Sequence, residues 1–172
     1  MGDEISANDQ VTRLLSVLEE QIKLYRHLLE VVRREKDILI SANLDDLTEN
    51  NRAKEAMLIK IRALEAERMA VSHEVHKALK LVGDEPRLLE IARYLDADNA
   101  EKLRNVHNVL ELLLRRVQEY SRQNDELVQS ALSNITGAMN ALKGSLQEKA
   151  TYQKKGEVEG HTAAGQLVSR EA

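Results

Sequence analysis

Residues 120–146 read YSRQNDELVQSALSNITGAMNALKGSL and lie within the proline-free stretch from Asp98 to Glu148. Apolar or small residues recur along this stretch at steps of three, four or seven, which places them on one stripe of a helix. They are Leu103, Val106, Leu110, Leu113, Val117, Tyr120, Leu127, Ala131, Ile135, Ala138 and Leu142. We therefore predict a single helix over about 98–148, about 75 Å long at 1.5 Å per residue.

The second half of this helix differs from the first because many of its residues are small, among them Ser133, Gly137, Ala141 and Gly144. A glycine inside a helix costs about 1 kcal/mol relative to alanine. Gly137 and Gly144 therefore favour a place where another backbone comes close, with a poorly optimised helix end as the alternative. We interpret this half of the helix as a docking face for a partner helix.

Two heptad seams precede the long helix and predict helices over about 8–41 and 44–82. The first seam consists of Val11, Leu15, Leu18, Ile22, Tyr25, Leu29, Val32 and Leu39. The second consists of Met57, Ile61, Leu64, Val71, Val75, Leu79 and Val82. A turn at 41–46 is expected between them, where Asp46 and Glu49 resemble a capping box.

The clearest break is Gly83-Asp84-Glu85-Pro86, which contains the only proline of the chain. We expect Gly83 in the left-handed position that ends the second helix, and Asp84 and Pro86 at the start of a short helix over about 85–95. Residues 149–172 contain three glycines and no sustained period, which predicts a flexible C-terminal tail.

The composition supports an all-α fold. Phe and Trp are absent and charged residues make up 31% of the 172 residues, which suits long helices packed through narrow aliphatic seams. We therefore predict an elongated antiparallel three-helix coiled-coil bundle over 8–148, with one additional short helix and the tail.

Several function classes are disfavoured by the same sequence. Acidic and basic residues are interleaved at a net charge of −4, so no broad basic surface for nucleic acid is expected. No apolar run approaches the roughly 18 residues of a membrane span, and the polar N-terminus is not a secretory signal. His73 and His76 are three residues apart with no third ligand in sight, so we expect no metal, no cofactor and no enzymatic activity.

Three stretches, taken in order, resemble the FlgN family of flagellar export chaperones. LDDLTENNRAK at 44–54, running into MLIKIRALEAER at 57–68, is similar to the second helix of the family. NDELV at 124–128, followed by Leu132 and Leu142, resembles the "N…LL" segment of the last helix, and TYQKKG at 151–156 is similar to the "Y-x-x-x-G" tail. The resemblance covers about residues 11–156, and the sequence departs from it at 48–54 and in the inserted helix 85–95.

This resemblance implies a cytoplasmic chaperone for a hook-associated (hook–filament junction) protein. Such chaperones bind the amphipathic C-terminal helix of the client, prevent premature assembly, and deliver the client to the flagellar export gate. The resemblance implies that Tyr152 docks on the cytoplasmic domain of the gate. The client-binding residues would be Asn124, Leu127, Val128, Ala131, Leu132, Ile135, Ala138, Met139 and Leu142.

Two other classes of function remain open on the residues alone. The heptad seams serve a self-assembling coiled-coil structural or adaptor protein equally well. A metal-dependent helical-bundle enzyme would need inward-facing Glu-x-x-His repeats, and the sequence contains none.

Overall fold

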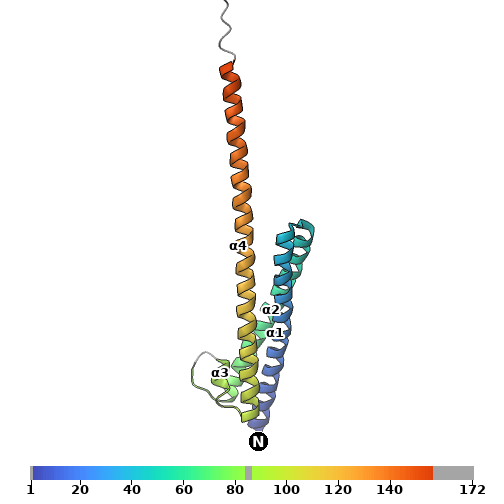
Figure 1. Cartoon of the computed structure of the whole chain (residues 1–172). Helices are drawn as coiled ribbons and strands as arrows, with labels where there is room; N and C mark the ends of the chain where they lie inside the picture. The colour runs from blue at the N-terminus through green and yellow to red at the C-terminus, as the bar shows by residue number, and fades with distance from the viewer. Residues whose placement is uncertain (1, 84–86, 157–172) are drawn as a thin grey trace, which may run out of the picture. The chain divides into compact units, whose positions relative to one another are not determined.

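The structure is a computed structural model of the chain that describes residues 2–83 and 87–156, with side-chain surroundings for 8–83 and 87–147. Its helices are α1 (Gly2–Ser41), α2 (Leu44–Ala78), α3 (Leu88–Ile91) and α4 (Ala97–Gly156) (Figure 1). Three long helices packed together with one short helix confirm the predicted all-α class. The chain divides into two compact units, the first ending at Val128 and the second beginning at Gln129.

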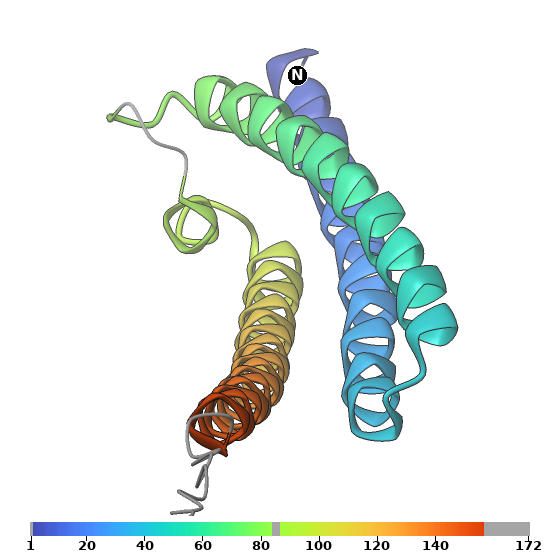
Figure 2. The ribbon, with the colours of Figure 1, turned by 90° about the horizontal axis from the view of Figure 1, so that it is seen from above.

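The turn between α1 and α2 forms without glycine or proline. Ala42 adopts a left-handed conformation with φ of 54°. Asn43 then caps α2, because its Oδ1 accepts the backbone N–H groups of Asp45 and Asp46, each at 3.2 Å. The capping residue is therefore Asn43 and not Asp46. Figure 2 shows α1 and α2 lying side by side after this turn.

The end of α2 differs from the sequence prediction. The helix ends at Ala78, four residues before the expected 82. Lys80 takes the left-handed position with φ of 51°, its N–H donates to the Lys77 carbonyl, and the Leu81 N–H donates to the His76 carbonyl, each at 3.1 Å. This is the Schellman arrangement, which satisfies the carbonyls at the end of the helix. Gly83 also has a positive φ, 123°, but lies beyond the helix end.

The segment between α2 and α4 holds less helix than predicted. The short helix α3 has four residues instead of the expected 85–95, and the predicted caps Asp84 and Pro86 lie outside the described residues. Asp96 stabilises the start of α4, because its Oδ1 accepts a hydrogen bond from the backbone N–H of Asn99 at 3.0 Å. Hydrogen bonds from the backbone and side chain of Asn99 hold the pKa of Asp96 below its ordinary value.

At their N-termini, α1 and α4 both begin earlier than the sequence pattern indicated, at Gly2 instead of about 8 and at Ala97 instead of about 98. At the other end α4 continues to Gly156, past the expected end at 148, because residues 145–155 include neither glycine nor proline. The first part of the predicted tail, 149–156, is therefore helical, and 157–172 lie outside the described residues.

The first unit is a bundle in which α1 and α4 run in the same direction and α2 runs in the opposite one. Asn99 donates to Asn8 at 3.3 Å near one end, and Lys36 donates to Gln123 at 3.1 Å near the other. Aliphatic residues of all the helices fill the centre, and Arg33 stacks over the ring of Tyr120 at 5.2 Å. The main buried cluster consists of Val11, Leu14, Leu18, Ile22, Leu29, Val71, Val75, Ile91, Ala92, Leu103, Leu110 and Leu113.

The predicted seams supply most of this core, but Leu14, which was not among the predicted seam residues, is fully buried in it, and one seam residue is exposed. Val82 is 93% exposed because α2 has already ended before it. In the second unit, by contrast, every residue from 129 to 147 is exposed, although all of them are helical.

Leu103→Ala should lower the free energy of unfolding by about 2–5 kcal/mol, because Leu103 is fully buried and its removal leaves a cavity. Leu142→Ala is the matched control on the same helix. Leu142 is 65% exposed, so the change should stay within about 0.5 kcal/mol. Urea unfolding followed by circular dichroism measures both. A loss of several kcal/mol in Leu142→Ala would mean that Leu142 belongs to an internal core.

Candidate functional site

The second unit presents a row of large apolar side chains that nothing in the structure covers. Leu132, Ile135, Met139, Leu142 and Leu146 are between 53% and 65% exposed. Their successive spacing of three, four, three and four residues is that of a coiled-coil seam. We call these five residues the apolar stripe. Leu146 was not among the predicted site residues, although the same spacing identifies it.

The positions that flank the apolar stripe are small or polar, with one charged residue among them. Gln129, Thr136 and Lys143 lie along one side of it, and Ala131, Ala138 and Ser145 lie along the other. Between residues 129 and 147 the only ionisable residue is Lys143. The surface is therefore apolar at its centre, and the charge of Lys143 lies at one edge.

The two glycines of this segment lie on the opposite side of the helix. At 100° per residue, Gly137 and Gly144 are turned roughly 160–180° away from the centre of the apolar stripe. A Cβ atom at either position would meet no atom within 4 Å. The sequence pattern placed these glycines on the docking face, and the helix geometry separates them from the large apolar residues.

The remaining predicted client-binding residues lie in the first unit. Val128, its last residue, is 38% exposed, and Leu127 is half-buried. Asn124 is buried, and its Nδ2 donates to the Val32 carbonyl at 2.9 Å and to Glu35 Oε2 at 3.0 Å. The other oxygen of Glu35 accepts from Lys54 Nζ at 2.5 Å. Tyr152 belongs to α4, but its side chain lies outside the described residues.

Glu35, Lys54 and Asn124 thus join the three long helices, and we call them the Glu35 cluster. The Glu35 and Lys54 side chains are only 10% and 29% exposed, so the ion pair is largely removed from water. A polar group in an apolar seam fixes register at the expense of stability. The sequence analysis missed this cluster because Glu35 is not one of the residues of the predicted first seam, which passes from Val32 to Leu39.

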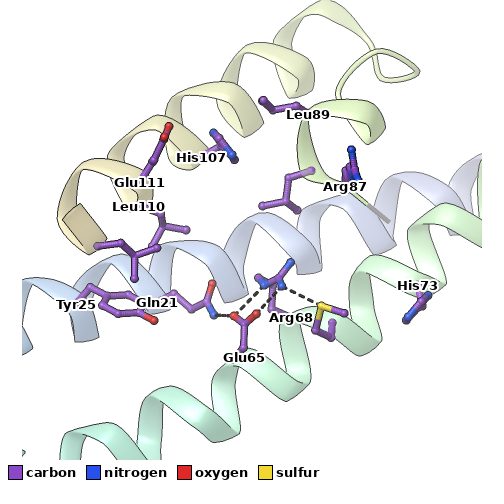
Figure 3. A pocket seen from close by; sticks show the side chains of 13 residues that line it. Gln21, Tyr25, Glu65, Arg68, His73, Arg87, Leu89, His107, Leu110 and Glu111 are labelled. Atoms are coloured by element: carbon purple, nitrogen blue, oxygen red, sulfur yellow. Dashed lines mark hydrogen bonds and ion pairs between the residues drawn. The ribbon is translucent and has the colours of Figure 1, made fainter. Parts of the chain in front are cut away.

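A cleft of about 660 Å³ opens among the four helices of the first unit (Figure 3). Gln21 and Arg68 point toward Glu65 inside it, with Gln21 Nε2 at 2.7 Å and Arg68 Nε at 2.9 Å from Glu65 Oε2. The hydrogen bond from Arg68 is the main reason that the pKa of Glu65 lies below its ordinary value. Burial is the main reason that the pKa of Tyr25 is raised.

Three of the charged residues that line the cleft are in ion pairs, since Glu65 pairs with Arg68 and Glu111 pairs with Arg115. His73 is exposed at the cleft wall, whereas His76 is buried. In the part of the chain that the structure describes, no three His, Asp or Glu side chains gather as a metal site. Nor does any described helix have the length and apolar character needed to cross a membrane.

These features define an α-helical bundle protein with an uncovered apolar helix face. The comparison with protein families specifies it further, since residues 1–160 match the family described as FlgN protein. The chain belongs to the FlgN family, the non-enzymatic flagellar export chaperones of hook-associated proteins. No curated protein and no solved structure matches the chain.

Asn124→Ala should lower the free energy of unfolding by about 1–3 kcal/mol, because the Val32 carbonyl and one oxygen of Glu35 lose a buried donor. Asn134→Ala is the matched control, since Asn134 is exposed on the same helix. Its effect should stay within about 0.5 kcal/mol. Guanidinium unfolding compares the two variants. Equal stability of both would show that the Glu35 cluster does not hold the three helices together.

Proposed function

We propose that this protein binds the amphipathic C-terminal helix of a hook-associated protein in the cytoplasm, prevents its premature assembly, and delivers it to the flagellar export gate. The observation that carries the proposal is the apolar stripe. Soluble proteins rarely leave a row of large apolar side chains uncovered unless a partner covers it. Family membership supports the class of client, and the stripe supports the mode of binding.

The contact would follow the helix-in-groove principle, in which apolar side chains at helical spacing anchor one helix on another. We assign the anchors to Leu132, Ile135, Met139 and Leu142, extended to Leu146 and to Val128 at the other end. Ala131 and Ala138 flank the anchors and let a second helix approach closely. Met139 adapts its shape readily because its side chain is unbranched and polarisable.

Two of the predicted client-binding residues have a different assignment. Asn124 is engaged with Val32 and Glu35, so we assign it to holding α4 in the bundle. Leu127 is half-buried and would contact a client only at its edge. The proposed surface is therefore centred further along α4 than the sequence motif.

Covering the client helix would also explain how assembly is delayed. A helix that later pairs with neighbouring subunits carries an apolar stripe of its own, and that stripe would otherwise associate too early. A chaperone helix with the same coiled-coil spacing occupies it reversibly. Release at the export gate would then return the client helix to its own partners.

Self-assembly through the apolar stripe is a second candidate function. The three-four spacing of the stripe is complementary to itself, so a second copy of the chain fits it on geometry. Sedimentation equilibrium separates the two functions. A dimer that persists in the presence of client would favour a scaffold, and a client complex with one copy of each chain would favour a chaperone.

Leu132→Asp should abolish client binding while far-UV circular dichroism stays nearly unchanged. A buried anchor of this kind is typically worth about 2 kcal/mol or more, and an unpaired charge adds a desolvation penalty. Ser130→Asp is the matched control, because Ser130 is exposed on the opposite side of α4. Titration calorimetry with the client measures both. If Ser130→Asp loses as much affinity as Leu132→Asp, the site assignment is wrong.

Tyr152→Ala should keep client binding and thermal stability unchanged but weaken retention on the cytoplasmic domain of the export gate. A tyrosine buries a large ring at a small loss of rotamer freedom. Tyr152→Phe is the control that keeps the ring and removes the hydroxyl. The measurement is binding of the chaperone–client complex to the isolated gate domain. Equal binding by wild type and Tyr152→Ala would refute the docking role.

A further inference from the structure

We infer that two copies of this chain associate reversibly, with the apolar stripe of each copy inserted into the first-unit cleft of the other. The inference goes beyond the proposed function, because it gives the apolar stripe a partner when no client is present. It also differs from pairing of two stripes, because the surface that receives the stripe is the cleft. The chain offers one protruding and one hollowed apolar surface, and a second copy can cover both.

The cleft resembles an empty helix position in a bundle. Its lining residues come from α2 and α4 on two sides, from α1 between them, and from α3 (Figure 3). Three elements each contribute a large apolar side chain that remains partly in water, since Met69 of α2 is 40% exposed, Leu89 of α3 46% and Leu114 of α4 38%. Large apolar side chains that converge on one cleft favour burial by a partner.

The apolar stripe matches the cleft in length and spacing. The lining residues of α4 lie on one face of the helix, from His107 to Leu114, which is about 10 Å at 1.5 Å per residue. In the apolar stripe, Ile135, Met139 and Leu142 cover the same number of residues on one helix face. Anchors at such spacing are the usual means by which a helix occupies a groove. Three exposed apolar side chains of the stripe thus correspond to three in the cleft.

Lys143 gives the contact its charge complementarity. It is the only ionisable residue between 129 and 147, and it is exposed at the edge of the apolar stripe. The cleft has two carboxylates, of which Glu65 is already held by two neighbouring side chains. Glu111 is 48% exposed, and its pair with Arg115, whose side chain is 74% exposed, is a weak surface pair. Glu111 is therefore the available partner for Lys143 of the second copy.

The remaining charged residues of the cleft do not oppose this contact. Glu65 and Arg68 neutralise each other, so covering them buries no unpaired charge. Arg87 and His73 are exposed where they line the cleft and can keep their water at its rim.

Reciprocal insertion closes the assembly at two copies, because each copy offers one stripe and one cleft. The apolar stripe cannot face a cleft and a client helix at the same time. Client binding on the stripe would therefore dissociate the dimer, and the dimer would keep the stripe out of water until client is present.

Sedimentation equilibrium of the full chain between about 1 and about 300 µM should show monomers and dimers in exchange, as expected for a small interface. Leu114→Asp should raise the dissociation constant of the dimer at least about tenfold, because it places a charge in the cleft. Leu112→Asp is the matched control, since Leu112 is 51% exposed on the same helix but does not line the cleft. Far-UV circular dichroism confirms that both variants remain helical.

A charge exchange tests the register without an apolar substitution. Lys143→Glu and Glu111→Lys should each weaken the dimer about tenfold, because like charges then meet at both contacts. An equimolar mixture of the two variants should recover nearly the wild-type affinity, because opposite charges meet at both contacts of the mixed dimer.

A chain that stays monomeric up to about 300 µM overturns the inference. A dimer that tolerates Leu114→Asp, or that the mixture of charge variants does not restore, overturns it as well, because two paired stripes would behave in that way. Client peptide should dissociate the wild-type dimer, and a dimer that persists while the peptide binds has its stripe elsewhere. If no client peptide binds, the proposed function fails, whereas the dimer and its charge exchange are measured without client.

Discussion

The inequality in length between α4 and the helices it packs against is the constraint from which the rest of the protein follows. Helix α4 has 60 residues, whereas α1 has 40 and α2 has 35. An antiparallel bundle buries only as much of one helix as its neighbours can cover. In the first unit α4 contributes Leu103, Leu110 and Leu113 to the core. The residues from 129 to 147 are helical as well, and all of them are exposed.

Helicity in that second segment therefore depends on local terms. Most helical stability in proteins comes from the packing of one apolar face and not from intrinsic propensity. Gly137 and Gly144 weaken it by about 1 kcal/mol each relative to alanine. A partner helix on the apolar stripe would supply the missing packing, and the segment would then gain order in the complex proposed above.

The fold was largely predictable because its core follows a regular spacing of aliphatic residues. Leu18, Ile22 and Val75 are buried where the heptads place them, and the turn after Ser41 was found from clustered capping residues alone. The residues at which the helices end were harder to predict. The sequence predicted that Gly83 takes the left-handed position that ends α2, but Lys80 takes it. Tertiary packing decides where α2 ends, and the sequence pattern does not report it.

In the candidate site, too, the regular apolar spacing was predictable, whereas contacts between distant parts of the chain were not. The spacing of the apolar residues beyond Leu127 could be recognised in the sequence, and the exposure of these residues agrees with a surface role. Asn124 belonged to the recognised motif, but its burial depends on Glu35, which is 89 residues away in the chain. No local pattern reports such a contact. Leu146 was missed for the simpler reason that the motif ended before it.

The scarcity of charge along the apolar stripe also determines which proteases can cleave it. Trypsin cleaves after lysine and arginine, and neither occurs between Arg122 and Lys143. The part of the stripe from Leu132 to Leu142 therefore contains no trypsin site, and Lys143 is the one site within the stripe. Proteases that cleave after leucine or methionine find several sites in it. Within the cell, such proteases would recognise the free chain by the same residues that we propose for the client.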